Sequence, residues 1–440
     1  MLTYPPDFLW GVSTSSHQFE GGDVPNQWCE WERQGRIRSG DRRGLACDWW
    51  RNAEVDLDLC RDLRLKSIRI SIEWARLEPE QGRWDRAAAE RYIEILQAIR
   101  NRGMRPFVTL HHFTNPIWFE AQEAFLSDDS PELFATFAEF AVQSLGAHCT
   151  DWLTFNEPNV YAVFGYMFAE FPPARRHAIR ECATVISHMH RAHALAYQRI
   201  HRLQPKANVG LTVNWIDFQP ETNSPADRLL TYSYDAVFNR SSLELLRSGS
   251  MRFPFGALGP DVPEAVDKTD FIGLNIYNRL CVRSGWGDQF LSTGGIFVPD
   301  HVPQGDSGVL QPYGEACPDA VTPAVKEYAR LGVPIYIFEN GVPDRADRIR
   351  PWVLVRSIHN VAKLIYSGYD IRGYFHWSIV DNFEWNEGWK LRFGLYEMDP
   401  ETQARTARPS AVLYKQIIRN QGVSDELYGR FSEQPVAGSA

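Results

Sequence analysis

The chain has 440 residues, of which 44% are hydrophobic, 13% aromatic and 23% charged, a composition typical of a globular protein with a large core. Its net charge of −9 argues against nucleic acid or an anionic membrane as the main partner, and no run approaches the ~20 apolar residues of a membrane span. The seven cysteines are scattered without a C-x-x-C spacing, which disfavours a disulfide framework and a zinc site. Because the first residues have neither a basic nor an apolar signal region, we expect a cytoplasmic location.

Strand-like runs alternate with helical patterns along the chain. Between the runs, segments such as residues 86–102 and 131–145 carry apolar residues at spacings of three and four, as amphipathic helices do. The eight predicted strands are residues 8–13, 67–74, 105–113, 152–156, 208–215, 270–277, 334–339 and 371–378.

Eight strand–helix repeats predict an α/β fold, a single (β/α)8 TIM barrel with its active-site loops at the C-terminal face of the strands. A doubly wound open sheet is the alternative, and the lack of a G-x-G-x-x-G after the first strand weakens it. We predict one catalytic domain over residues 1–420 and a flexible tail over residues 421–440. The longest segments outside the predicted strands and helices, residues 14–55, 216–269 and 279–330, are expected to be loops and short insertions over the active-site face.

Two glutamates, Glu157 and Glu339, each stand at the end of a predicted strand. Each is followed at once by a chain-breaking residue or pair, so the strand ends at the carboxylate. Packing does not explain such a residue, because a buried carboxylate is costly to desolvate. Two carboxylates brought together from distant parts of a chain are what cleavage of a glycosidic bond requires, one as proton donor and one as nucleophile or base. The pair therefore predicts a sugar-cleaving enzyme.

The other predicted strand ends also carry polar or aromatic side chains where a core favours aliphatic ones. A sugar pocket combines hydrogen-bonding side chains around the ring with tryptophan beneath its apolar face. Taken singly, each residue has a plainer structural explanation, such as a buried ion pair for an arginine or a core contact for a histidine. The set is His17, Gln18, Arg69, His111, His112, Asn156, Asn214, Trp215, Asn275, Tyr277, Trp377, Glu384 and Trp385.

Seven motifs resemble those of glycoside hydrolase family 1, the β-glucosidase family, and they occur in the family's order over about residues 4–420. The resemblance implies a retaining β-glycosidase, most simply a β-glucosidase. Such an enzyme hydrolyses the terminal nonreducing residue of a small-molecule or oligosaccharide β-glycoside, with no cofactor and no metal. The motifs are Phe8-Leu-Trp-Gly11, His17-Gln-Phe-Glu20, Thr154-Phe-Asn-Glu-Pro158, Asp270-Phe-Ile-Gly-Leu-Asn-Ile-Tyr277, Glu339-Asn-Gly341, Gly373-Tyr-Phe-His-Trp-Ser-Ile-Val-Asp-Asn-Phe-Glu-Trp385 and Arg392-Phe-Gly-Leu395.

The resemblance also implies roles for individual residues. Glu157 matches the family's acid/base and Glu339 its nucleophile, and Arg69 and Tyr277 match the residues that hold the nucleophile. Asn275 lines the same pocket, and Trp377 matches the platform beneath the sugar. The matches to the ligands of the nonreducing-end sugar are Gln18, His112, Asn156, Glu384 and Trp385.

Three departures from the family's pattern surround these residues. The usual Trp-Asp-Leu-Pro run is replaced by Phe113-Thr-Asn-Pro116, and the Gly-Gly-Trp that follows is replaced by residues 124–129. Phe338 stands where a threonine commonly precedes the nucleophile. We therefore expect an intact catalytic set with an altered pocket rim, so that aglycone preference is not inherited.

The substrate class can be narrowed by the resemblance. Family members that act on 6-phosphosugars carry a serine where Glu384 stands, so we expect a neutral glycone such as glucose, galactose or fucose. Thioglucosidases of the family lack the acid/base glutamate, whereas Glu157 is present, so we expect O-glycosides.

The expected mechanism couples the two glutamates. Ionised Glu339 raises the pKa of Glu157 by charge repulsion and keeps it protonated until the glycosyl-enzyme forms. Two alternatives remain open at this point, a transglycosylase using the same site and a non-catalytic sugar-binding barrel. The sequence also leaves homo-oligomerisation open.

Overall fold

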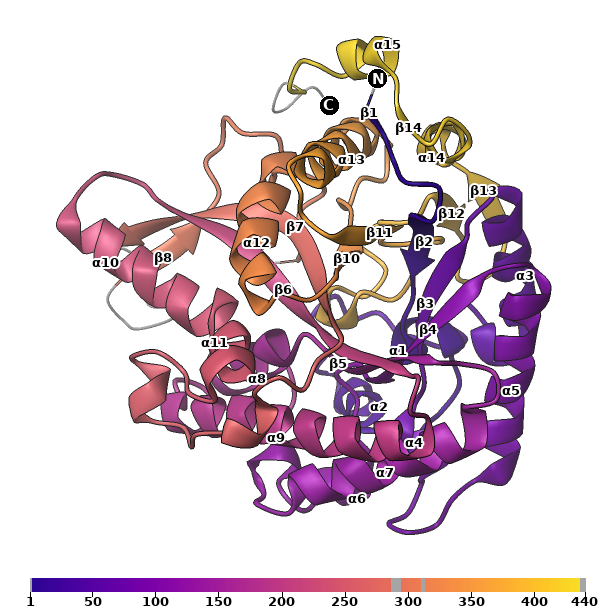
Figure 1. Ribbon diagram of the computed structural model, residues 1–440, viewed down its shortest axis with the longest axis vertical. Coiled ribbons are helices and arrows are strands. Elements are labelled where there is room, and N and C mark those ends of the chain that lie inside the picture. The colour runs from indigo at the N-terminus through magenta and orange to yellow at the C-terminus, as the bar shows by residue number, and fades with distance from the viewer. Residues whose placement is uncertain (1, 286–293, 310–312, 436–440) are drawn as a thin grey trace.

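The computed structural model describes residues 2–285, 294–309 and 313–435 (Figure 1). Eight parallel strands pair in chain order, and the pairing of the sixth with the seventh completes a closed barrel. The predicted (β/α)8 barrel is therefore confirmed, and the doubly wound open sheet is wrong. The barrel strands are β2 (Leu9–Ser13), β3 (Ser67–Ser71), β4 (Arg105–His111), β5 (Asp151–Asn156), β6 (Asn208–Pro220), β7 (Phe271–Ser284), β10 (Ile335–Asn340) and β11 (Ile371–His376).

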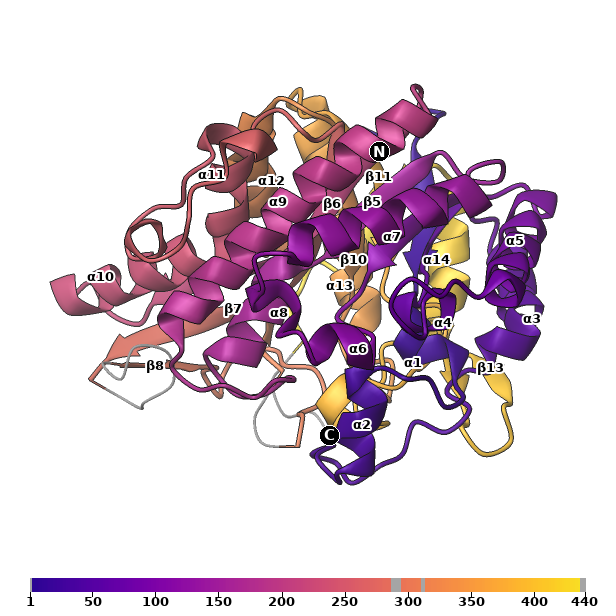
Figure 2. The same cartoon turned by 90° about the horizontal axis from the view of Figure 1, so that it is seen from below.

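A helix of the outer layer follows each barrel strand. Two of the long ones, α7 and α9, lie side by side across one flank (Figure 2). Within the described residues, no helix combines the length and the apolar character that crossing a membrane requires. The outer helices are α3 (Trp49–Asp62), α5 (Arg86–Asn101), α7 (Ser130–Leu145), α9 (Ile179–Leu203), α11 (Ser241–Ser248), α12 (Val321–Tyr328), α13 (Arg350–Tyr366) and α14 (Pro409–Arg419).

Local sequence signals explain where these helices begin. Asp85 caps α5 by accepting a hydrogen bond from the backbone N–H of Ala88 at 3.0 Å. Proline occupies the first turn of α7, α13 and α14, where a missing N–H costs nothing.

The long segments outside the predicted barrel elements are more regular than expected. β6 and β7 run past the barrel as a two-stranded extension, to which β8 (Gly294–Phe297) adds an antiparallel strand. Together with α10 (Pro225–Tyr234), this extension projects at the left of Figure 1. Residues 216–269 and 279–330, predicted as loops, therefore supply strand extensions and the outer helices α11 and α12. A cross-strand ion pair between Arg279 and Asp217, at 2.8 Å, joins the extended strands.

Smaller elements complete the fold. The remaining short helices are α1 (Ser16–Glu20), α2 (Gln27–Arg33), α4 (Trp74–Leu77), α6 (Ile117–Glu120), α8 (Pro158–Tyr166) and α15 (Asp425–Arg430). The remaining short strands are β1 (Leu2–Thr3), β9 (Glu315–Ala316), β12 (Tyr396–Met398), β13 (Arg405–Ala407) and β14 (Gly422–Val423).

The start of the C-terminal tail packs against the body of the protein. β14 pairs with β1, and Leu427 on α15 is buried. Within the predicted flexible tail, the side chains of Val423 and Leu427 are buried, so residues 422–427 pack against the body.

The barrel interior is filled by an aromatic cluster drawn from several strands. Its buried members pack around Phe338, whose ring centroid lies 5.0 Å from that of Phe107 and 4.8 Å from that of Phe375. This packing closes the barrel below the level of Glu339 and leaves its C-terminal end for polar side chains. The cluster comprises Phe107, Leu153, Phe271, Tyr336, Phe338 and Phe375.

Candidate active site

Irregular pairing near the ends of β5 and β10 accompanies the placement of the two glutamates. The register of β10 shifts between Ile337 and Glu339, and that of β5 shifts between Leu153 and Asn156. A shift of this kind re-aims the side chains that follow it. Phe338 accordingly packs inside the barrel while the adjacent Glu339 also reaches the polar cluster at the strand ends. Glu157 has a left-handed φ of 48° and stands immediately before α8.

Glu339 is held by two donors. Arg69 donates to its Oε1 from β3, and the hydroxyl of Tyr277 donates to its Oε2 from β7. All three side chains are buried. A carboxylate that receives charge-assisted hydrogen bonds on both oxygens has its orientation fixed. The structure thus places Arg69 and Tyr277 on the predicted nucleophile.

Hydrogen bonds then run from Arg69 to Glu157 through two asparagines. Arg69 has no acceptor, so the atom of Asn156 that it contacts is the amide oxygen. Asn275 Nδ2 donates to that same oxygen at 3.0 Å and to Glu157 Oε1 at 2.7 Å. Asn214 Nδ2 donates to Glu157 Oε1 as well, at 2.9 Å.

The same contacts define the tautomer of His112. With the oxygen of Asn156 turned to Arg69, its Nδ2 faces His112 Nε2 at 3.1 Å and donates to it. His112 Nε2 is then an acceptor, so the imidazole is neutral and carries its proton on Nδ1. Burial, followed by the charge of Arg69, lowers the pKa of His112 well below its ordinary value. Nδ1 has no hydrogen-bond partner among the described residues, so it is a free donor within the site.

A second set of hydrogen-bonded side chains lies beside the set around Glu339 and Glu157. Gln18 Nε2 donates to Asn382 Oδ1 at 2.8 Å, while Ser15 donates to Gln18 Oε1 at 2.6 Å. Asn382 in turn contacts Glu384, and the indole N–H of Trp377 donates to Glu384 Oε1 at 3.0 Å. The segment after β11 is therefore tied to α1 by hydrogen bonds between side chains.

Aromatic rings pack between the set of side chains around Glu339 and Glu157 and the set around Glu384. The ring of His112 lies 6.3 Å from that of Trp377 and 6.0 Å from that of Trp385. Trp385 is stacked on His17 at 5.3 Å with an interplanar angle of 7°. The ten residues predicted for catalysis and sugar binding, together with Arg69, thus meet in one cluster.

Three carboxyl groups of this cluster have raised pKa values. Burial, followed by the negative charge of Glu339, raises the pKa of Glu157 to about 8. Burial also raises the pKa of Glu339, but the charge of Arg69 and the hydrogen bonds from Tyr277 and Arg69 oppose that effect. Burial raises the pKa of Glu384 to about 8, with the other two glutamates adding to it. Of the three, Glu339 alone has a cation bound directly to it, so it is the group most readily ionised.

The remaining strand-end residues have structural contacts. His111 Nε2 pairs with Asn115 Oδ1 at 2.9 Å, and its ring packs against Phe125 on the outer side of β4. Trp215 is buried against Tyr328. These contacts fit the plainer explanations that the sequence allowed.

Sequence reasoning did not assign three residues of the site. Asn214 stood in the strand-end set without a role, and its position at the C-terminal end of the barrel part of β6 was the available signal. Asn382 bridges Gln18 and Glu384. Tyr313 packs edge-on against Tyr277 at 6.0 Å and interacts electrostatically with Glu384 and Glu157. Asn382 lies within the motif from Gly373 to Trp385, which was the available signal, whereas no sequence pattern marked Tyr313.

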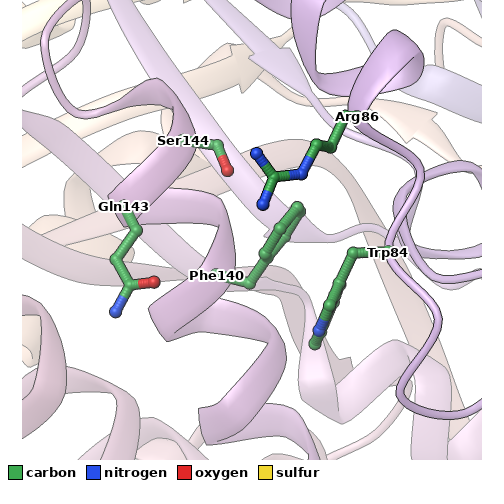
Figure 3. Close-up of a pocket in the computed structure, with 5 residues that line it drawn as sticks. All are labelled: Trp84, Arg86, Phe140, Gln143 and Ser144. Carbon is green, nitrogen blue, oxygen red and sulfur yellow. The ribbon is translucent and has the colours of Figure 1, made fainter.

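Outside this cluster, we looked for a metal site and for a surface hollow lined by catalytic groups. Within the described ranges, no three metal-ligating side chains converge. A hollow of about 600 Å³ lies between α5 and α7, where Trp84 and Phe140 stack at 4.1 Å and cover each other's faces (Figure 3). Arg86, Gln143 and Ser144 complete its lining, and it contains no carboxyl group.

The fold and this cluster define a class of protein. Two buried glutamates stand at the carboxyl ends of the fourth and seventh strands of a (β/α)8 barrel, and one of them is bound by a cation, which is the arrangement of carboxyl groups that a glycoside hydrolase requires.

The comparisons with known proteins give the family. The profile of glycosyl hydrolase family 1 matches residues 1–423, and the chain belongs to that family. It is similar to a structure of a beta-glycosidase from Pyrococcus horikoshii, with 34% identity, a TM-score of 0.89 and 98% of each chain covered. It is also similar to the beta-glucosidase from Thermotoga maritima in complex with glucoimidazole, with 26% identity, a TM-score of 0.88 and 96% and 100% covered. A curated relative is a beta-galactosidase from Pyrococcus woesei, 28% identical over 96% of this chain and 98% of that protein. The family assignment does not favour the non-catalytic barrel or the dedicated transglycosylase.

Proposed function

We propose that this protein is a retaining β-glycosidase that hydrolyses the terminal nonreducing residue of a neutral β-D-glycoside. The observation that carries the proposal is the unequal environment of the two glutamates. Glu157 has a pKa of about 8 and, among the described residues, its carboxyl group accepts from two neutral amides, whereas Glu339 is bound by the guanidinium of Arg69. Near neutral pH this favours a protonated Glu157 beside an ionised Glu339, the state from which glycosyl transfer begins.

In the first step, a carboxylate oxygen of Glu339 bonds to the anomeric carbon. The bond from that carbon to the leaving oxygen breaks, and the proton of Glu157 moves to this oxygen. Once Glu339 is esterified its charge is gone, so the repulsion that raised the pKa of Glu157 disappears. In the second step Glu157 takes a proton from water, the water oxygen bonds to the anomeric carbon, and the ester to Glu339 breaks. Two displacements restore the original configuration.

The polar residues around the pair support a hexose glycone. His112 offers a free N–H on Nδ1, and the Gln18–Asn382–Glu384 group offers both donors and acceptors. Trp377 lies beside His112 and supplies an apolar surface for the C–H face of the ring. Relatives named β-glucosidase and β-galactosidase make glucose and galactose the first sugars to test, with glucose preferred.

A panel of nitrophenyl β-glycosides, with the product anomer followed by NMR, tests this function. We expect fastest turnover on the glucoside, slower turnover on the galactoside and fucoside, and a β-anomer as the first product. The Glu339→Gln variant is the control, because it keeps the shape of the site and removes the nucleophile. A first-formed α-anomer would refute the retaining mechanism, and equal turnover by the control would refute the site.

We also propose that the enzyme works in the cytoplasm. Its seven cysteines are free thiols, and six of them are buried, which supports a reducing compartment. Cell fractionation followed by the glucoside assay tests this location, and activity recovered outside the cytoplasmic fraction would contradict it.

A further inference from the structure

Two asparagines from neighbouring strands donate to the same oxygen of Glu157. Asn275 on β7 and Asn214 on β6 both direct Nδ2 at Oε1, at 2.7 and 2.9 Å. A protonated carboxyl group has one good acceptor, its carbonyl oxygen, and one donor, its hydroxyl. Two N–H donors on Oε1 identify it as the carbonyl oxygen.

Arg69 sets the direction of the hydrogen bond from Asn275 to Glu157, and it does so through Asn156. Arg69 can only donate, so it fixes the amide of Asn156 with the oxygen inward, and Asn275 must then present its NH₂ group to that oxygen. The same NH₂ group faces Glu157 Oε1. Reversing the amide of Asn275 would place its oxygen against the oxygen of Asn156. Because Arg69 can only donate, it fixes the NH₂ group of Asn275 toward Oε1 of Glu157.

The backbone of Asn214 is anchored by contacts that do not involve the hydrogen bonds running from Arg69 to Glu157. Its backbone N–H donates to Asn159 Oδ1 at 3.3 Å, and Asn159 Nδ2 donates to its carbonyl oxygen at 2.9 Å. Asn159 lies in the first turn of α8, two residues after Glu157. The backbone of Asn214 is therefore held at a fixed place relative to the carboxyl group that its side chain contacts.

We propose that Asn214 and Asn275 are positioning residues that confine the catalytic proton to Oε2 of Glu157 and so reserve that oxygen for the leaving group. This inference rests on the proposed function, because it assigns an atom to the proton transfer. In the second step the same two donors stabilise the anion that accepts a proton from water. They oppose the effect of burial and so keep the acid strong enough to protonate a leaving group.

The acidity of Glu157 is set by groups from every element that surrounds it. Burial and Glu339 raise its pKa, and the two asparagines and Arg69 lower it. The titratable and charged groups that face it are Arg69, Tyr277, Tyr313, Glu339 and Glu384. Asn214 is the cleanest test residue, because its side chain touches Glu157 and no other catalytic group.

The test compares Asn214→Ala and Asn275→Ala with Asn360→Ala, a buried asparagine on α13 whose side chain donates to Asp319 and Pro318 rather than to a residue of the site. Each test variant loses a donor to Oε1. We expect the basic limb of the kcat/KM profile to move up by about one pH unit. We also expect a larger loss of kcat/KM on alkyl glucosides than on nitrophenyl glucosides, because alkyl leaving groups depend on the proton. Asn360→Ala should change neither the pH profile nor the ratio of activities on alkyl and nitrophenyl glucosides.

NMR titration of ¹³C-carboxyl-labelled glutamate gives a readout that does not need turnover, with the Glu157 signal assigned from its absence in Glu157→Gln. We expect the pKa of Glu157 to rise in Asn214→Ala and Asn275→Ala and to stay unchanged in Asn360→Ala. An unchanged or lower pKa in both test variants would overturn the inference. If wild type cleaved no β-glycoside, the proposed function would fail while this titration still decided the role of the two asparagines.

Discussion

Trp377 donates a hydrogen bond from its indole Nε1 to Glu384 Oε1 at 3.0 Å, in a site where burial raises the pKa of Glu384 to about 8. A carboxylate at Glu384 would repel a phosphate on the sugar, whereas a protonated carboxyl group would not. Much of Glu384 is protonated at neutral pH, because burial and two neighbouring glutamates disfavour its charge. Its repulsion of a phosphate should therefore depend on pH.

The repulsion of a 6-phosphate by Glu384 should increase with pH. The preference for a β-glucoside over its 6-phosphate, measured as a ratio of kcat/KM values, should grow as pH rises from 6 to 9. Over this range Glu384 loses its proton, and the phosphate, with a second pKa of about 6, is largely a dianion above about pH 7. The ratio cancels effects common to both substrates. Glu384→Ser should flatten the pH dependence and raise relative activity on the phosphate by about tenfold or more. A flat ratio in wild type would show that the charge of Glu384 does not discriminate.

The second prediction concerns Glu339. Replacing it with alanine removes the only carboxylate bound by Arg69 within the described site, so hydrolysis of a nitrophenyl glucoside should fall by roughly a thousandfold or more. Azide, which can occupy the vacated space, should restore part of the rate and give a product of inverted configuration. The anomer is read by NMR. Near wild-type activity without azide would reject Glu339 as the nucleophile.

The third prediction separates the two proton transfers. Glu157→Ala should slow alkyl glucosides far more than dinitrophenyl glucosides, because a dinitrophenolate leaves without a proton. With the activated substrate, a pre-steady-state burst should appear as breakdown of the glycosyl-enzyme becomes limiting. Equal losses on both substrates would argue against Glu157 as the proton donor.

The fourth prediction concerns stability. The pKa of Glu157 is raised to about 8 in the folded protein, against about 4.3 for an unfolded glutamate. Between these values the unfolded chain releases a proton that the folded protein retains, so the contribution of Glu157 to stability falls as pH rises through this window and is lost above about 8. Glu157→Gln should therefore stabilise the fold by on the order of 1–3 kcal/mol at pH 8 and much less at pH 5. Denaturant unfolding of wild type and Glu157→Gln at pH 5 and pH 8 measures the two changes in the free energy of unfolding. Equal changes at the two pH values would contradict this prediction.

The barrel could be predicted because buried parallel strands appear as short apolar runs that end at a polar residue. Glu157 and Glu339 were identifiable because they break that pattern at a strand end. The lengths of β6 and β7 could not be predicted, since polar residues such as Asp217 and Arg279 resemble loop residues until they are seen paired across two strands.

The electrostatics of the site also required the three-dimensional structure. The raised pKa of Glu384 depends on its burial and on carboxyl groups from two other strands. The role of Asn214 depends on a contact with Glu157, 57 residues away. Asparagine at a strand end shows that a polar group is present, whereas its partner and the direction of its hydrogen bond follow only from packing.

The buried carboxyl group of Glu73 links the segments that carry Gln18 and His112. Glu73 Oε2 accepts hydrogen bonds from Ser16 at 3.2 Å and from Thr114 at 3.1 Å. Ser16 begins the helix that carries Gln18, and Thr114 follows His112 by two residues within the run that departs from the family's usual pattern. Glu73 Oε1 has no partner among the described residues, and burial, followed by Glu20, raises the pKa of Glu73.

The fifth prediction distinguishes the shape of Glu73 from its charge. Glu73→Gln keeps an oxygen to accept from Ser16 and Thr114 and removes a negative charge near Glu20, so stability at pH 7 should be unchanged or higher. Glu73→Ala removes the acceptor and leaves a cavity, so we expect a loss of about 2–4 kcal/mol and a raised KM with a smaller change in kcat. Chemical denaturation and steady-state kinetics on a nitrophenyl glucoside measure both effects. If glutamine proved as damaging as alanine, the charge of Glu73 rather than its accepting oxygen would be what holds the two segments together.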